Sequence, residues 1–128
     1  MQVPAFLLRR LYVKGSLHNT DDGFEFELMN TLGAGYADRV LPLQVDGQEL
    51  PLEQAAFVVD RKRIRFDEIS PEQPMTLAMN NALSVSVKGR PLADGKHTLG
   101  IGFEVSGMGE LQFDVTDAIG EDDGDAGQ

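Results

Sequence analysis

Apolar residues recur at every second position along most of this chain, and that alternation limits the possible folds more than any other feature. In FEFELM at 24–29, phenylalanine and leucine alternate with glutamates and a methionine, and LSVSV at 83–87 repeats the pattern. HTLGIGFEV at 97–105 and ELQFDV at 110–115 do the same. A β-strand with one buried face has a period of two, whereas an amphipathic helix needs apolar residues three and four apart. The alternation therefore predicts antiparallel strands.

Turn residues separate these stretches at intervals of about ten residues. The pair Asp-Gly, typical of tight hairpin turns, occurs at 46–47 and at 94–95. AAFVVDRKRIRF at 55–66 predicts two short strands, and the two prolines of DEISPEQPMTL at 67–77 predict a loop. About nine short strands with this spacing favour an antiparallel β-sandwich, with an open barrel as the second choice.

The N-terminal stretch FLLRRLYVKGSL allows two interpretations. Leu7, Leu8 and Leu11 are spaced as on one face of a helical turn. Leu11 and Val13 instead suit a strand that is interrupted by a bulge at Gly15. We expect the bulged strand here, leading into the next turn.

The length of 128 residues suits one domain with one hydrophobic core. We expect this domain to span 1–119 and the glycine- and acid-rich stretch at 120–128 to be a disordered acidic tail. The absence of cysteine excludes disulfides, thiolate metal sites and a cysteine nucleophile, and it fits a reducing compartment. There is no secretory signal pattern and no apolar run of about 18 residues, so we expect a cytoplasmic protein without a membrane partner.

The formal net charge of −10 argues against nucleic acid as a partner, because phosphate binding needs a basic face. Three G-x-G pairs occur, but none has the third glycine and the following helix of a phosphate-binding loop. G-x-S-x-G and S-x-x-K arrangements are absent. We therefore expect no cofactor and assign no catalytic residue.

His97 follows a glycine-containing turn at the head of an apolar run. By alternation with Leu99 and Ile101 its side chain should point inward near the end of a strand, where histidines are typically packed or bonded to a turn. We keep it as a candidate binding or interface residue. A metal site would need more ligands, and the only other histidine, His18, lies in the turn-forming stretch SLHNTDDG. We assign no metal.

Two further features suggest a contact surface. Gly100 and Gly102 share the face opposite the apolar side chains of their strand, so another backbone or subunit could approach there. NTLGAGYADRV at 30–40 is expected to be a long loop between strands, and its Tyr36 and Arg39 are of the types enriched in binding hot spots. These four residues are the candidate interface.

The order of the elements also resembles a known family. GFEFELMN, LPLQVDGQELPLEQAAFVVD, IRFDEIS and PLADGKHTLGIGFEV are similar to the domain of small β subunits of bacterial C-glycoside deglycosidases and their relatives. The closest pieces are the Asp-Gly hairpin at 46–47, the Asp-Glu pair at 67–68 and the L-x-x-G-x-H turn at 92–97. The resemblance implies a β-sandwich beside a barrel subunit that itself supplies the metal and the catalytic bases. The loop TLGAGYADR departs from the aromatic, arginine-rich stretch of that family.

We therefore expect a non-catalytic β-sandwich accessory subunit or assembly module. Its partner would be a second copy of the chain, as a homo-oligomer, or another protein, such as a sugar-metabolising barrel enzyme. One alternative is a small module that binds a metabolite or a carbohydrate, although the chain has no tryptophan and only two tyrosines to stack against sugars. The other alternative is a small metal-dependent enzyme that uses His18 and His97.

Overall fold

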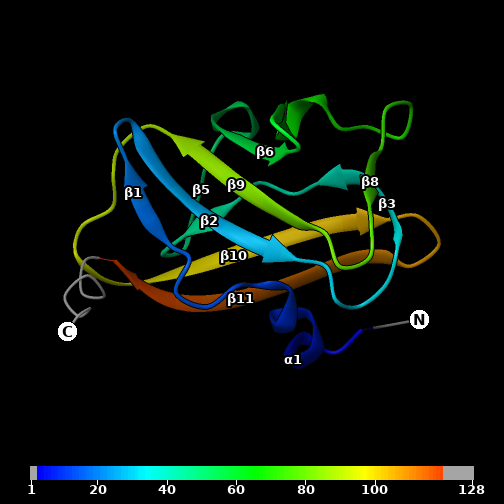
Figure 1. The fold of residues 1–128 in the computed structure, drawn as a ribbon, viewed down its shortest axis with the longest axis horizontal. Helices are drawn as coiled ribbons and strands as arrows, with labels where there is room; N and C mark the ends of the chain where they lie inside the picture. The colour runs from blue at the N-terminus through cyan, green and yellow to red at the C-terminus, as the bar shows by residue number, and fades with distance from the viewer. Residues whose placement is uncertain (1–2, 120–128) are drawn as a thin grey trace.

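The fold is a sandwich of two antiparallel β-sheets (Figure 1). The computed structural model describes residues 3–119, so the tail expected at 120–128 lies outside the described residues. One sheet has the order β1-β2-β9-β6-β7, and the other has the order β5-β4-β10-β3-β8 with β11 paired to β10. The strands are β1 (His18–Thr20), β2 (Gly23–Met29), β3 (Gly35–Val40), β4 (Gln44–Val45), β5 (Gln48–Glu49), β6 (Ala55–Val59), β7 (Lys62–Arg65), β8 (Met75–Leu77), β9 (Ala82–Lys88), β10 (Gly95–Val105) and β11 (Gly109–Ile119).

The core lies between the sheets and is built by the predicted alternation. In β2 the phenylalanines and the leucine are buried while the glutamates face outward. Phe57 of β6 stacks on Phe66 with ring centroids 4.6 Å apart, and it meets Phe103 of β10 at 6.3 Å, which joins the two layers. The sandwich prediction is confirmed, with eleven strands in the described part rather than nine.

The hairpin predicted at Asp46-Gly47 is confirmed as the turn between β4 and β5. Both residues have positive φ angles, 53° and 87°, as a type I′ turn requires. The hairpin between β6 and β7 turns in the same way at Asp60 and Arg61, with φ angles of 51° and 69°, although neither residue is a glycine. The short 3-10 helices η2 (Leu52–Gln54) and η3 (Phe66–Glu68) complete the connections around these strands.

The N-terminal strand prediction is wrong. Residues Ala5–Leu8 form the helix α1 and Arg9–Leu11 the 3-10 helix η1, directly after Pro4. The segment lies over the gap between the edges of the two sheets. Leu8 is part of the core and Leu11 packs against it, and the two side chains lie on the same side of the segment because the segment is helical. No helix within the described residues is long and apolar enough to cross a membrane.

The long loop expected at 30–40 is also shorter than predicted. β3 begins at Gly35 and pairs with both β8 and β10, so Tyr36 and Arg39 lie on a strand rather than on a flexible connection. This strand has no two-residue alternation, because its buried residues Ala37 and Val40 are three positions apart and its pairing with β10 shifts register between them.

Candidate functional site

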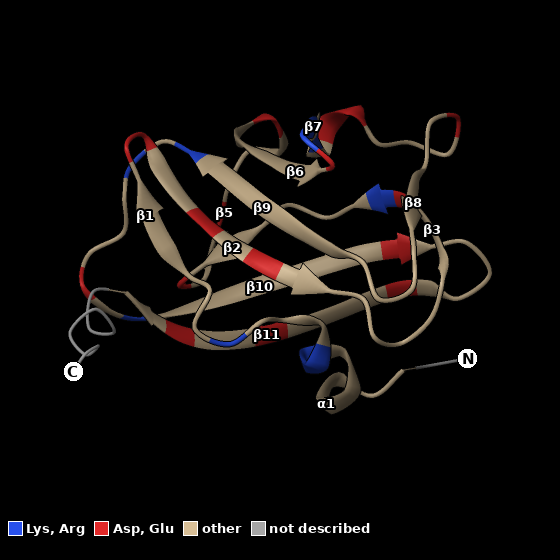
Figure 2. Cartoon of the chain, in the orientation of Figure 1, with Lys and Arg blue, Asp and Glu red and all other residues tan. Residues whose placement is uncertain are grey.

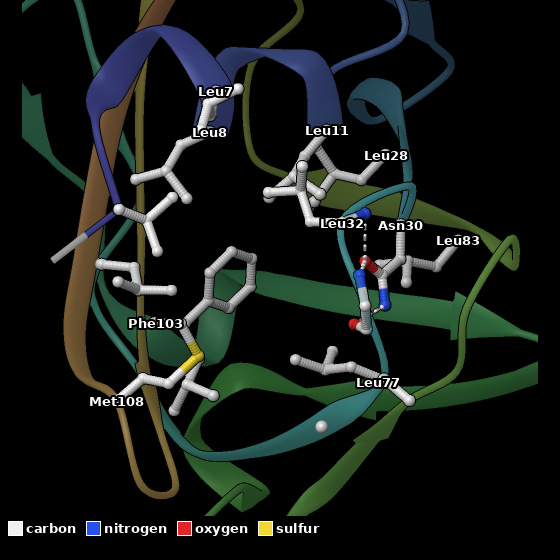
Figure 3. Close-up of a pocket in the computed structure, with 16 residues that line it drawn as sticks. Leu7, Leu8, Leu11, Leu28, Asn30, Leu32, Leu77, Leu83, Phe103 and Met108 are labelled. Carbon is white, nitrogen blue, oxygen red and sulfur yellow. Dashed lines mark hydrogen bonds between the residues drawn. The ribbon is translucent and has the colours of Figure 1, made fainter. Parts of the chain in front are cut away.

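An apolar hollow of about 450 Å³ opens at one end of the sandwich, beneath α1. Figure 3 shows Leu7, Leu8 and Leu11 of the N-terminal segment on one side of it and Phe103 and Leu77 on the other. The walls thus come from the N-terminal segment and from strands of both sheets. Pockets of about 300–1,000 Å³ are the size that takes small molecules or the side chains of a partner.

Among residues 3–119, Asn30 is the one polar side chain that lines the hollow, and its amide is fully bonded within the chain. Its Nδ2 donates to the carbonyls of Gly33 and Ala78 at 2.8 and 3.1 Å. Its Oδ1 accepts from the backbone N–H groups of Leu32 and Gly33 at 3.2 and 3.3 Å. An amide has two donor hydrogens and one carbonyl oxygen, so Asn30 has no donor left for a ligand. Its role is to fold the loop between β2 and β3 around the mouth.

Three loops meet at this mouth through backbone hydrogen bonds. Asn80 donates to the carbonyl of Asn30 at 2.6 Å, which joins the β8–β9 loop to the β2–β3 loop. Ser106 donates to the carbonyl of Tyr36 at 3.0 Å, which joins the β10–β11 hairpin to the start of β3. The three loops therefore form one continuous rim.

The rim carries no charge, in a chain where 25% of residues are charged. The segments 29–37, 75–87 and 105–109 contain no Asp, Glu, Lys or Arg, and Figure 2 shows the tips of these loops in tan. We call this surface the uncharged end. It also exposes large apolar side chains, with Tyr36 55% exposed and Met79 50% exposed. The exposed large apolar residues of the rim are Leu32, Tyr36, Met79 and Met108.

The N-terminal wall of the hollow is fastened to β11 by Asp117. This carboxylate is only 7% exposed. It accepts hydrogen bonds from the hydroxyl of Tyr12 at 2.6 Å, from the N–H of Gly15 at 2.8 Å and from the N–H of Ala118 at 2.9 Å. We call this set the Asp117 clasp.

Two basic side chains extend the attachment along the outer edge of β11. Arg9 Nε donates to the carbonyl of Asp114 at 3.0 Å, and Lys14 Nζ donates to the carbonyl of Thr116 at 3.1 Å. These bonds occupy backbone acceptors that an edge strand would otherwise leave open to another strand.

The clasp also shifts the pKa values of its two acidic groups. Burial and the hydrogen bond to the carboxylate raise the pKa of Tyr12 above its ordinary range. Burial alone would raise the pKa of Asp117, but the hydrogen bonds it accepts outweigh burial, so its pKa lies below the ordinary value. Asp117 is therefore ionised at neutral pH, and Tyr12 is a neutral donor.

His97 lies at the opposite end of β10, on the same face as Leu99. Its side chain is 11% exposed, with Nδ1 2.7 Å from Asp46 Oδ2 and Nε2 2.7 Å from the carbonyl of Ala93. Both ring nitrogens thus face acceptors, so the doubly protonated imidazolium fits this position. The carbonyl of Ala93 and the carboxylate of Asp46 raise the pKa of His97. The hydrogen bond from the N–H of Thr98, followed by the one from His97, lowers the pKa of Asp46.

The two histidines have different partners. His18 Nδ1 is bonded to the carbonyl of Ser16 at 2.9 Å, and its Nε2 lies 3.4 Å from Glu25, so it shares no partner with His97. Within residues 3–119 no three His, Asp or Glu side chains are grouped as metal ligands.

The other candidate interface residues are spread over the second sheet. Arg39 Nε donates to Glu104 at 3.1 Å, so its guanidinium is held on the neighbouring strand. Gly100 and Gly102 lie on the outer face of β10, where a Cβ at Gly102 would come within 2.6 Å of the side chain of Leu41. Side chains of this chain already occupy that face. Of the predicted residues, only Tyr36 lies at the uncharged end.

A comparison with protein families gives one match. The model of the hydroxymethylglutaryl-CoA reductase N-terminal domain matches residues 7–120, which is most of the chain. The chain belongs to this family. A comparison with curated proteins found no match.

Membership of the reductase N-terminal domain family overturns the resemblance to the β subunits of C-glycoside deglycosidases. The pieces that carried the resemblance are turns. Asp46-Gly47 is an ordinary type I′ turn, and Gly95, with a φ of 110°, begins β10 within the L-x-x-G-x-H stretch. The stretch before Gly95 connects β9 of one sheet to β10 of the other, and Asp67 and Glu68 lie in η3, so these pieces are common connections rather than marks of a family.

Sequence reasoning missed the apolar hollow of this reductase N-terminal domain. Two signals pointed to it. The leucines at 7, 8 and 11 had helical spacing, and the loops at 29–37 and 105–109 lacked charge. Neither signal predicts that these segments lie together. The pairing of β3 with β8 and β10 brings them together, and that pairing is not visible in the local sequence.

Proposed function

We propose that the chain is a non-catalytic β-sandwich module that docks onto a protein through its uncharged end. The absence of charge around a rim of exposed apolar side chains carries the proposal. Solvated loops normally carry charged residues, and charged residues are depleted at the centres of interfaces, where aromatic residues and methionine are enriched. Tyr36 and Met108 are the anchors this surface offers.

The family match supports a partner that belongs to the same enzyme. The family is described as a domain of hydroxymethylglutaryl-CoA reductase, which suits a module that lies against the catalytic part of such an enzyme or against a second copy of itself. A sugar-metabolising barrel was expected as a partner only because of the overturned resemblance, so we no longer propose it. Carbohydrate binding also loses support, because the hollow offers no free polar side chain to sugar hydroxyl groups.

The test places one charge at each end of the sandwich. Met108→Glu puts a carboxylate on the rim, and Ala93→Glu puts the same charge at an exposed position at the other end. The chain is mixed with the catalytic part of a hydroxymethylglutaryl-CoA reductase from the same organism, and association and self-association are measured by sedimentation velocity.

We expect the wild-type chain and Ala93→Glu to associate with equal affinity and Met108→Glu to bind at least about tenfold more weakly, because a buried unpaired carboxylate costs more than 1.4 kcal/mol. Equal binding by both variants, or no association of the wild-type chain with either partner, would contradict the proposal.

A further inference from the structure

We propose that the hollow is a binding site for the hydrocarbon chain of a free, uncharged amphiphile, such as a medium-chain alcohol or ester. This inference goes beyond the docking function and does not depend on it, because it concerns the depth of the hollow rather than the exposed rim. Three properties of the hollow carry it: its shape, its lack of polar groups and its lack of charge.

The first property is that the hollow extends into the core. The walls include Leu8, Leu83 and Phe103, which are core residues with almost no exposure, so the hollow reaches the layer between the two sheets. Native cores leave few voids larger than a water molecule. A space of about 450 Å³ that continues the core is therefore an unfilled part of it, open at one side. A partner that only covers the mouth leaves this space unfilled, whereas a hydrocarbon chain that enters it removes apolar surface from water.

The lining selects against polar ligands. The donors of Asn30 are bonded to the carbonyls of Gly33 and Ala78, so within residues 3–119 no polar side chain offers a proton to a group inside the hollow. A polar group buried without a partner loses the hydrogen bonds it had with water. A hydrocarbon ligand loses no hydrogen bonds in such a lining and removes apolar surface from water.

The lack of charge selects against ionised amphiphiles. None of the lining residues is charged, and the rim segments 29–37, 75–87 and 105–109 carry no charge either. With a net charge of −10 for the whole chain, a carboxylate head group gains no partner from these rim segments and is repelled at longer range. An alcohol should therefore bind more tightly than the fatty acid of equal length.

The experiment uses a tryptophan reporter, because the chain has no tryptophan of its own. Met108→Trp places an indole at the mouth, and Ala93→Trp places one at the other end as the matched control. Decanol and decanoate are titrated separately at pH 7.5 while the emission maximum is recorded, and binding of decanol to the unmodified chain is measured by calorimetry.

We expect a blue shift of Met108→Trp that saturates at one equivalent of decanol, an affinity for decanoate at least about tenfold lower, and no shift of Ala93→Trp. Adding Leu111→Asp to the reporter should place a charge in the apolar lining and abolish the shift, and urea unfolding of each variant checks that it is folded. Leu111 is only partly buried, so this substitution tests the hollow without replacing the core.

Two results would overturn the inference. The first is no saturable shift and no heat with decanol, or a shift that occurs only with phosphatidylcholine vesicles. The second is an emission maximum of Met108→Trp that is already at short wavelength without alcohol and shifts to longer wavelength when the protein is diluted. That result would place a side chain of a second copy in the hollow, and it would leave the docking function standing. A failure of Met108→Glu to weaken docking would instead remove the docking function alone.

Discussion

Removing the carboxylate of Asp117 should detach the N-terminal segment from β11 and measurably destabilise the domain. Asp117→Ala deletes an acceptor that is 7% exposed and takes two long-range hydrogen bonds, from Tyr12 at 2.6 Å and from Gly15 at 2.8 Å. Hydrogen bonds to a charged group contribute about 1.5–3 kcal/mol each, and the two share one carboxylate, so we expect a loss of about 2–4 kcal/mol. Domains have a total stability of about 5–15 kcal/mol, so this loss is a large fraction of it.

Urea unfolding followed by circular dichroism would measure this loss as a fall of about 1–2 M in the midpoint. Tyr12→Phe removes one donor and leaves the carboxylate with two backbone partners, so it should cost about 1–2 kcal/mol. The double variant should cost clearly less than the sum of the two single variants, because both remove the same bond. A loss below about 1 kcal/mol for Asp117→Ala, or strict additivity with Tyr12→Phe, would refute the reasoning that the clasp holds the segment.

The remaining predictions concern acidity and backbone geometry. The pKa of His97 is raised from 6.5, so its contribution to stability is complete below pH 6.5 and is lost as pH rises through the pKa of the folded state. The pKa of Asp46 is lowered from 3.8, so its contribution to stability is complete above pH 3.8 and is lost as pH falls through the pKa of the folded state. The free energy of unfolding, measured by urea titration from pH 4 to 9, should therefore decline above about pH 6.5 by up to about 1 kcal/mol, because Asp46 is half exposed. His97→Gln should flatten this decline. Gly23→Ala would place a Cβ 1.8 Å from the carbonyl oxygen of Val87 and should cost about 3 kcal/mol or more in the same assay; an unchanged midpoint would contradict the close approach. Arg61→Gly should raise stability by about 1 kcal/mol, because only glycine adopts a φ of 69° without strain, and a loss would show that the arginine is held by other contacts.

The sheets were predictable because their signal is local. The alternation of each strand indicates its buried face, so β2, β9, β10 and β11 follow from short stretches of sequence. Asp46-Gly47 predicted a hairpin correctly, whereas Asp94-Gly95 lies at the start of β10 in a connection between the two sheets. β3 did not, because alanine, glycine and arginine have little strand preference and its position is fixed by two neighbouring strands.

The candidate site was less predictable because its parts are distant in sequence. Leu7 and Met108 line one hollow although about a hundred positions separate them, and no local pattern records that contact. The N-terminal segment was assigned to a strand because its leucines fit two periods, and the choice between them depends on the seam that the finished sandwich leaves open. The histidines attracted attention through their chemistry, yet His97 is held by a turn carbonyl and a carboxylate far from the hollow.

The hydrogen bond between Tyr12 and Asp117 joins groups that are 105 positions apart. During synthesis the first of them leaves the ribosome about 5–20 s before the second, at ordinary rates of translation. Through that interval the leucines of the N-terminal segment have no β11 to lie against, and they must stay in solution or on a chaperone until the final strand arrives. Closure of the hollow is therefore a late step in the folding of each newly made chain. The growing chain is most exposed to aggregation just before that step.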